Sequence, residues 1–370
     1  MIMHNIPQME PSYDGEEIKA MTDYFKSEGW GGEFIQTEKL EKMICKLTGA
    51  KYCSMTVNGT VSLTLAMIAL GLKQGDEILV PDMTMIASPN SAKLIGVKAI
   101  LVDIEPETLC VDLTAAEKCL TKKTKALMYV AFNGRSGNMD KVKRFCKIHN
   151  LFLIEDAAQA LGSYYKGRHL GTFGDIGSFS FSVPKIITTG QGGALITNNK
   201  SLYKKIEKIK DFGRIKSGID IHNEVGWNFK FNDFLAIIGI AQMKKLKKRI
   251  KFKKNLYQKI YTGLKDIPQI KFIATNLDDT SPWFIDIYVK NRTKLIDYLK
   301  SKNIGTRVVY PAINRQPVYQ DEYKDKLFLV TEKIAKDGLW LPSSVNLSNI
   351  EINYIIKNIR KFYSNLKNKL

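Results

Sequence analysis

Residues 177–195 read Gly-Ser-Phe-Ser-Phe-Ser-Val-Pro-Lys-Ile-Ile-Thr-Thr-Gly-Gln-Gly-Gly-Ala-Leu, with Lys185 near the centre. A hydroxyl-rich strand precedes this lysine, a glycine-rich turn follows it, and apolar residues flank it on both sides. No helical face solvates the amine. A lysine amine in a partly apolar pocket loses its proton more easily and can attack a carbonyl carbon. Lys185 is therefore a candidate Schiff-base lysine, and a buried lysine paired with a carboxylate is the alternative.

The chain on both sides of this stretch alternates between strand and helix patterns. Strands are expected at residues 77–81, 99–104, 126–132 and 151–154, and helices at 61–70, 88–95 and 139–149. Two further helices are expected before them, at 14–28 and 36–48. This alternation predicts an α/β fold with a mostly parallel sheet and helices on both faces.

The pattern changes after about residue 240. A lysine-rich helix over 236–262 leads into short strands at 270–272 and 283–289 and helices at 292–302 and 350–366. The sequence therefore predicts two domains. Residues 1–240 form the large domain with an N-terminal segment, and residues 241–370 form a smaller C-terminal α/β domain, within the usual size range.

Composition excludes several classes of protein. The five cysteines are scattered and the four histidines show no ligand spacing, so neither a disulfide framework nor a metal site is expected. No secretory segment and no apolar run of about 20 residues is visible, which predicts a cytoplasmic protein without a membrane partner. The net charge of +19 invites a nucleic-acid partner, but its lysines lie on amphipathic stretches, and a solvated face is the preferred interpretation.

Polar residues that could bind a ligand occur at three further points. Asn58-Gly59-Thr60 stands before a helix, where backbone N–H groups can cradle a phosphate, although an ordinary N-cap has the same composition. Asp156 follows a buried strand and needs a partner, either a pyridinium nitrogen or the start of the next helix. Ser180 can hydrogen-bond a phosphate. Because ligands of parallel sheets bind at the carboxyl ends of strands, we expect these features to converge around Lys185.

Four motifs occur in a fixed order along the chain. They are Asn58-Gly-Thr60, Glu155-Asp-Ala-Ala-Gln-Ala-Leu-Gly-Ser163, Ser178-Phe-Ser-x-x-x-x-Lys185 with the following Thr-Thr-Gly-Gln-Gly-Gly-Ala, and Gly226-Trp-Asn-Phe-Lys-Phe-Asn-Asp233. This order resembles the DegT/DnrJ/StrS-type sugar aminotransferases, fold-type-I enzymes that use pyridoxal 5′-phosphate (PLP). The resemblance covers about residues 7–360. It implies an aspartate-aminotransferase-like large domain with a smaller C-terminal α/β domain.

The resemblance also implies residue roles. Lys185 would be the catalytic Schiff-base lysine and proton shuttle, and Asp156 would pair with the pyridine nitrogen. Asn228 would reach the phosphate in the neighbouring subunit of a homodimer with shared active sites. The full set of implied cofactor-binding residues is Gly59, Thr60, Met85, Asp156, Gln159, Ser180, Lys185 and Asn228.

The chain departs from the family pattern at three positions. Met85 stands where an aromatic residue usually covers the cofactor ring, and it would contact that ring through its sulfur. Arg135 lies in a loop that often reads His-x-Tyr-Gly and adds a planar cation suited to phosphate or carboxylate. Asn314 stands where histidine is frequent. These positions are expected near the keto substrate, and the expected substrate-binding residues are Trp30, Arg135, Arg307, Tyr310, Asn314 and Arg315.

The sequence thus predicts a PLP-dependent aminotransferase that moves an amino group from L-glutamate to a phosphorylated keto substrate. The favoured acceptor is a nucleotide-linked keto sugar of surface polysaccharide biosynthesis. A small keto phosphate clamped by the two extra arginines, Arg135 and Arg315, is an alternative. A non-catalytic PLP-binding or nucleic-acid-binding regulator is another. A nicotinamide oxidoreductase is disfavoured, because no Gly-x-Gly-x-x-Gly follows the first strand.

Overall fold

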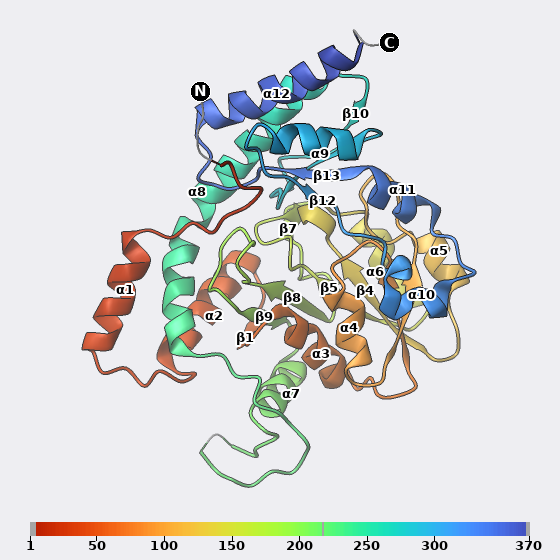
Figure 1. Cartoon of the computed structure of the whole chain (residues 1–370). Helices are drawn as coiled ribbons and strands as arrows, with labels where there is room; N and C mark the ends of the chain where they lie inside the picture. The colour runs from red at the N-terminus through yellow and green to blue at the C-terminus, as the bar shows by residue number, and fades with distance from the viewer. Residues whose placement is uncertain (1–4, 217, 368–370) are drawn as a thin grey trace.

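The computed structural model describes residues 5–216 and 218–367, which form two sheets joined by one long helix (Figure 1). The large sheet has the strand order β1-β9-β8-β5-β4-β2-β3. Its strands are β1 (Tyr52–Thr56), β9 (Gly193–Thr197), β8 (Ile176–Ser180), β5 (Phe152–Asp156), β4 (Thr124–Val130), β2 (Glu77–Pro81) and β3 (Lys98–Val102). Only β9 runs against the others, so the predicted mostly parallel sheet is confirmed.

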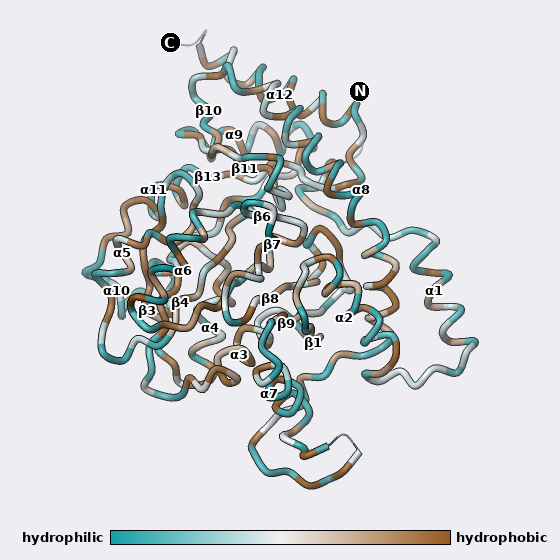
Figure 2. Tube along the Cα trace, turned by 180° about the vertical axis from the view of Figure 1, so that it is seen from behind, coloured by the Kyte–Doolittle hydropathy of each residue, from teal (hydrophilic) through white to brown (hydrophobic). Residues whose placement is uncertain are grey.

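Helices cover both faces of this sheet. One face carries α3 (Gly59–Leu70), α4 (Ala87–Lys93) and α7 (Lys200–Lys210). The other carries α2 (Ile35–Thr48), α5 (Leu113–Lys118), α6 (Met139–Ile148) and the first half of α8 (Asp233–Leu264), on which α1 (Gly15–Lys26) packs. In Figure 2, hydrophobic stretches gather around α3 and β4, whereas α7 is largely hydrophilic. α3 is apolar on nearly all sides because it is buried on nearly all sides.

The second half of α8 belongs to a smaller C-terminal unit. Its antiparallel sheet has the order β10 (Ile270–Lys271), β11 (Ile285–Val289), β13 (Gly338–Leu341) and β12 (Arg307–Val308). α9 (Arg292–Lys300) and α12 (Asn349–Lys367) cover it together with α8, around a core that includes Ile260, Ile287 and Ile355. The expected smaller α/β unit is therefore present.

The predicted division after residue 240 falls inside α8. Two segments also pack on the unit that lies on the other side of this division. Ile6 pairs with Ile304 and lies in the core of the C-terminal unit. The segment that holds η2 (Ile313–Arg315), α10 (Pro317–Tyr323) and the start of α11 (Leu329–Asp337) returns to the large sheet, where the Tyr323 hydroxyl donates to the Ala99 carbonyl of β3. A boundary drawn by residue number therefore separates residues that pack in one core.

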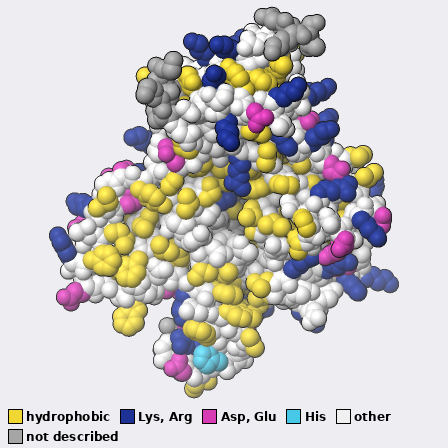
Figure 3. Space-filling model, in the orientation of Figure 1, with side chains coloured by type: hydrophobic (Ala, Val, Ile, Leu, Met, Phe, Trp, Pro, Cys, Tyr) yellow, Lys and Arg dark blue, Asp and Glu magenta, His cyan; other side chains and the backbone are white. Residues whose placement is uncertain are grey.

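Two smaller features complete the fold. β6 (Tyr164–Tyr165) and β7 (Arg168–His169) form a short hairpin, and η1 (Phe132–Gly134) follows β4. Between α7 and α8, residues 211–216 and 218–232 belong to an extended arm that projects below the sheet in Figure 1. Apolar side chains gather over this arm and over α1 in Figure 3. The exposed large hydrophobic residues of these regions include Phe25, Trp30, Phe34, Ile215, Ile221 and Val225.

Candidate active site

The carboxyl edge of the large sheet gathers the polar residues that the sequence singled out. Asp156 ends β5, Ser180 ends β8, and Gly59 begins α3 directly after β1. β5 and β8 are neighbours, with Asp156 opposite Ser178. A Cβ atom added to Gly59 would lie 2.9 Å from the Ser180 Cβ, so the backbones approach as closely as glycine permits. Residues that are 120 positions apart in the sequence thus line one edge.

Lys185 lies in the turn that follows β8, where its backbone N–H donates to the Ser182 carbonyl. Its Nζ lies 4.2 Å from the centroid of the Trp283 ring. In the part of the chain that the structure describes, no carboxylate forms an ion pair with this amine. Loss of water around the amine lowers the pKa of Lys185 to about 8; the Asp156 charge opposes this shift and the Arg307 charge adds to it. The site therefore favours a neutral amine far more than water does.

Asp156 is buried and held by two donors. The Ser88 hydroxyl donates to its Oδ2 at 2.7 Å, and the Ala158 N–H donates to its Oδ1 at 3.2 Å. Ser88 is in turn 2.8 Å from the Thr84 hydroxyl. Burial raises the pKa of Asp156, while these donors and the Lys185 charge act in the opposite direction. A buried acid with few donors needs a positive partner, and a pyridinium nitrogen meets that need.

Gln159 is fixed by the loop after β4. Its Oε1 accepts the backbone N–H of Asn133 at 2.7 Å. Asn133 is buried and has φ 56 and ψ 26, a left-handed conformation that non-glycine residues keep only where their surroundings impose it. Its side-chain amide bonds both backbone groups of Phe284, at 2.6 and 2.8 Å. This loop therefore connects Gln159 to the C-terminal unit.

The start of α3 forms an anion cradle. Asn58 caps the helix by accepting the Val61 N–H, and its carbonyl accepts the Ser62 N–H. Among the described residues, no acceptor is bonded to the N–H groups of Gly59 and Thr60. These amides and the positive end of the helix dipole suit a phosphate. The N-cap interpretation of the Asn58-Gly59-Thr60 motif is thus confirmed. Because the cap leaves two donors free, the phosphate cradle stays a prediction that the geometry permits.

Two predicted substrate residues lie beside the Lys185 amine. Arg307 is exposed on β12, and its guanidinium stacks over the rings of Tyr310 and Trp340 at 5.8 and 5.5 Å. Its charge acts on Lys185. Burial raises the pKa of Tyr310, and the Asp156 charge adds to that shift. Both residues therefore belong to the same site, although they come from the C-terminal unit.

Three other predicted residues point to solvent in a single chain. Trp30 lies in the loop before α2 and is 80% exposed. Met85 is 45% exposed after β2, and its sulfur accepts the Ala87 N–H. Asn228 is exposed on the arm, where it pairs with Asp211. A single chain brings neither Trp30 nor Asn228 into contact with Lys185, so their roles stay predictions.

The expectation that Arg135 binds substrate is wrong. Its guanidinium is 3% exposed and forms a bidentate ion pair with Asp286, at 2.6 and 2.8 Å. The Nε–H donates to the Thr275 hydroxyl at 2.8 Å. The coulombic attraction of Asp286 holds the pKa of Arg135 above its ordinary value in spite of burial. The guanidinium therefore has no free edge for a phosphate and joins η1 to β11 instead.

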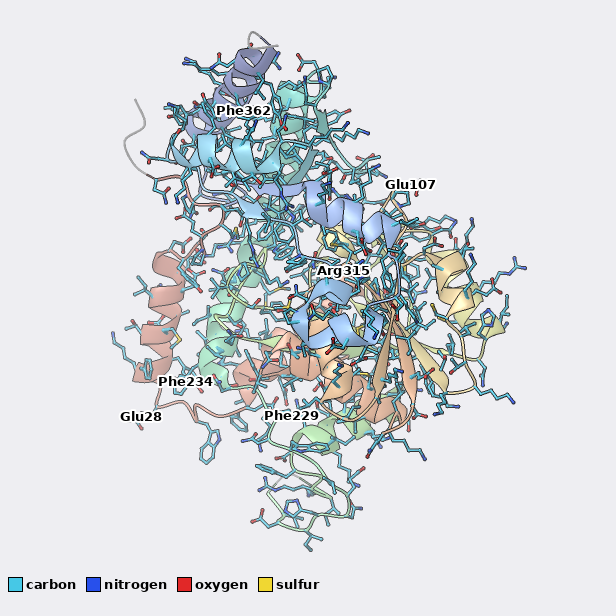
Figure 4. All side chains as sticks on the ribbon, turned by 45° about the vertical axis from the view of Figure 1, so that its right-hand side comes forward. Glu28, Glu107, Phe229, Phe234, Arg315 and Phe362 are labelled. Carbon is cyan, nitrogen blue, oxygen red and sulfur yellow. The ribbon has the colours of Figure 1, made fainter. Side chains whose placement is uncertain are left out.

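The side chains of Asn314 and Arg315 both donate to Glu332. Asn314 is fully buried; its backbone N–H donates to Asp82 at 2.7 Å and its side chain to Glu332 at 3.3 Å. Arg315, labelled in Figure 4, lies beside α10 and donates to the same Glu332 carboxylate at 2.7 Å. Asn314 has no exposed surface, but its Oδ1 has no hydrogen-bond partner among the described residues, so its contact with substrate stays a prediction. Arg315 keeps only its exposed edge for a ligand.

Three residues of the site were missed by sequence reasoning. Trp283 covers the Lys185 amine, Asn133 fixes Gln159, and Ser88 holds Asp156. Ser88 lies in the first turn of α4, and Thr84 lies in the segment before that helix. Nothing in the sequence around Trp283 or Asn133 indicates their contacts, because both reach across the two units.

A sequence profile of the DegT/DnrJ/EryC1/StrS aminotransferase family matches residues 11–360. The chain belongs to this family. This aminotransferase is 34% identical to the GDP-perosamine synthase of Escherichia coli O157:H7, and the alignment covers 98% of this chain and 100% of the relative. It is 31% identical to a GDP-perosamine synthase of Vibrio cholerae, with 97% and 99% of the two chains covered. Its fold matches that of Helicobacter pylori PseC, an aminotransferase involved in the biosynthesis of pseudoaminic acid, with a TM-score of 0.91 and 23% identity over 98% and 100% of the chains.

The protein is a PLP-dependent aminotransferase of fold type I. Its own residues fit the cofactor. The free amides at Gly59 and Thr60 suit the phosphate, the buried Asp156 carboxylate suits the ring nitrogen, and the Lys185 amine suits the aldehyde. Gly59 has no room for a side chain, which keeps this cradle open. Within residues 5–216 and 218–367, no helix is long and apolar enough to span a membrane.

Proposed function

We propose that this aminotransferase transfers the amino group of L-glutamate to the keto group of a nucleotide-linked sugar in the cytoplasm. The observation that carries the proposal is the Lys185 amine, with its pKa lowered to about 8, beside the buried Asp156 and the cradle at Gly59. The two GDP-perosamine synthases, at 34% and 31% identity over nearly the whole chain, support a sugar nucleotide as the acceptor.

Bound PLP supplies an aldehyde carbon for amines and a ring that withdraws electrons from the bond being broken. The protein residues hold the cofactor in place. The N–H groups of Gly59 and Thr60 and the Ser180 hydroxyl would hold its phosphate. Asp156 would keep its ring nitrogen protonated, and Gln159, fixed by Asn133, would donate to its ring oxygen.

Lys185 moves the proton. An amine whose pKa is about 8 is partly neutral near physiological pH, so Nζ can accept the α-proton of the donor and later return it to the acceptor. The Asp156 charge, which acts on this amine, keeps the pKa from falling further. Lys185 thus serves as base in one half of the reaction and as acid in the other.

The substrate side of the site is formed by Arg307 and Tyr310. Arg307 is exposed and, in the described part of the chain, forms no ion pair, so its guanidinium is free to bind a carboxylate or a phosphate. The alternative of a small keto phosphate rested on Arg135 and Arg315, which are bonded to Asp286 and Glu332 instead. That alternative therefore loses its basis.

The arm and Trp30 fit a second copy of the chain. Asn228 is exposed on the arm, and exposed apolar residues accompany it there and over α1 (Figure 3). Large exposed apolar surfaces are typical of interaction sites. We propose a homodimer in which Asn228 and Trp30 complete the site of the partner.

The test incubates the enzyme with PLP, L-glutamate and a panel of nucleotide-linked keto sugars and small keto phosphates, and follows amine formation by mass spectrometry. We expect an aminated sugar nucleotide together with one equivalent of 2-oxoglutarate. Turnover of the small keto phosphates alone would contradict the proposed acceptor, and a donor other than glutamate would contradict the proposed donor.

A further inference from the structure

Trp283 contacts Lys185 in two ways although the two residues belong to different units. It precedes β11 and is only 3% exposed. The centroid of its ring lies 4.2 Å from the Lys185 Nζ. Its indole N–H donates to the carbonyl of Pro184 at 2.7 Å, which is the peptide group directly before Lys185. One side chain thus contacts both the end of the lysine side chain and the start of its backbone.

Trp283 is itself held firmly. Its ring stacks on Phe284 with a centroid distance of 3.9 Å and meets Trp340 edge to face at 5.7 Å. Phe284 is bonded on both backbone groups to the side chain of Asn133. The indole therefore has a fixed position relative to the large sheet, and a fixed ring can hold a flexible lysine side chain in one place.

We propose that Trp283 is a positioning residue for Lys185. Its ring face holds the amine and excludes water from it, and its N–H fixes the backbone of the turn. The inference rests on Lys185 being the reactive amine of the proposed function. Gln159 and Ser180 line the same small cavity as Lys185 and Trp283.

Two opposing effects act on the proton of Lys185. A ring face attracts a charged ammonium group, but a ring that displaces water disfavours it. The amine pKa lies below its ordinary value, at about 8, because burial by the surrounding groups lowers it. We propose that the indole supplies much of this burial, and that its replacement by a smaller side chain admits water to the amine. The charged groups that act on this amine are Asp156 and Arg307, and neither belongs to the segment of Trp283. Removal of the indole should therefore raise the pKa of the amine.

The experiment measures the pH dependence of Lys185 acetylation in the full-length protein after removal of PLP. Acetic anhydride reacts with the neutral amine and releases acetate and a proton, and mass spectrometry quantifies the peptide that contains Lys185. We expect the midpoint of Trp283→Leu to rise by at least one pH unit, so labelling near neutral pH should fall by roughly tenfold. Trp283→Phe keeps a ring without the indole N–H and should give a smaller rise.

Tyr288→Phe and Tyr288→Leu are the matched controls, since Tyr288 is buried in the same cluster and its hydroxyl bonds to Asp286. Both should leave the midpoint unchanged, with folding checked by near-ultraviolet circular dichroism. Wild-type midpoints in the Trp283 variants, or equal shifts in the Tyr288 variants, would overturn the proposal. If Trp283→Leu does not fold, Trp283→Phe decides. The labelling uses no substrate, so a failure of the proposed sugar reaction would leave this result valid.

Discussion

Two lysines of this protein, the buried Lys210 and the half-buried Lys185, have opposite surroundings. Lys210 at the end of α7 lies 2.7 Å from Glu33 and 2.9 Å from Glu207, with Glu41 at 4.0 Å. These carboxylates hold the pKa of Lys210 above its ordinary value in spite of burial. Lys185 faces an indole ring instead, and its pKa falls to about 8. The presence or absence of contacting carboxylates thus separates a structural cation from a reactive amine.

The largest effect is expected from Lys185→Ala. Turnover should fall by more than about 10³-fold, because both the attachment point and the proton carrier are lost. End-point assays of 2-oxoglutarate formation measure this loss of turnover. Lys185→Arg should be equally inactive, since a guanidinium stays protonated. Appreciable turnover by either variant would contradict the assignment of Lys185, in contrast to Lys210, as the reactive amine.

Lys210→Met should affect stability instead. The change leaves buried carboxylates without their cation and should cost about 3–5 kcal/mol in the free energy of unfolding, measured with urea. The matched control is Lys208→Met on the same helix, whose half-exposed pair with Glu224 should contribute less than about 1 kcal/mol. A raised pKa in the folded state means that the Lys210 contribution is present at neutral pH and is lost at pH values above its ordinary 10.5.

Asp156→Asn tests the carboxylate that acts on Lys185 without contacting it. Turnover should fall by about 10²-fold, because the neutral amide cannot keep a ring nitrogen protonated. The pH midpoint of Lys185 should also move below about 8, since the Asp156 charge raises it. Glu155→Gln is the control on the same strand. The Glu155 carboxylate accepts three backbone N–H groups. Its replacement should therefore lower stability and leave the pH midpoint of Lys185 unchanged.

The same contrast separates two arginines. Arg307→Ala should raise KM for the keto substrate by roughly tenfold and raise the pH midpoint of Lys185, because a nearby positive charge is removed. Arg135→Ala should instead destabilise the fold, because it leaves the Asp286 charge buried without a partner. A selective loss of the keto-substrate half-reaction in Arg135→Ala would contradict the structural role.

The last effect concerns Glu41. Burial raises its pKa to about 8, so the folded protein holds a proton there that the unfolded chain releases above its ordinary 4.5. Wild-type stability should therefore decline between about pH 5 and pH 8 relative to Glu41→Gln, by on the order of 3 kcal/mol. Urea unfolding at both pH values measures this difference. Parallel stabilities across this range would show that Glu41 is ionised beside Lys210.

Much of the architecture could be predicted from local patterns. The strand at residues 77–81 was located to the residue, and the helices at 139–149 and 236–262 to within a few residues. The strand β9 was not predicted. The helices α10 and α11, in the segment that returns to the large sheet, were not predicted either. Apolar periodicity reports the burial of a segment but not the surface on which it packs.

The sequence by itself predicted the α/β fold and the polar residues at the carboxyl edge, because glycines, acids and hydroxyls next to strand ends carry a local signal. The cofactor followed from the family resemblance of the four ordered motifs. The tertiary structure decided which charged groups stay free. Arg135 was expected to bind substrate, but Asp286 pairs with its guanidinium. Trp283 looked like part of a strand until its ring was found over Lys185. The chemistry of a charged side chain depends on its partners in space, and those partners come from distant parts of the chain.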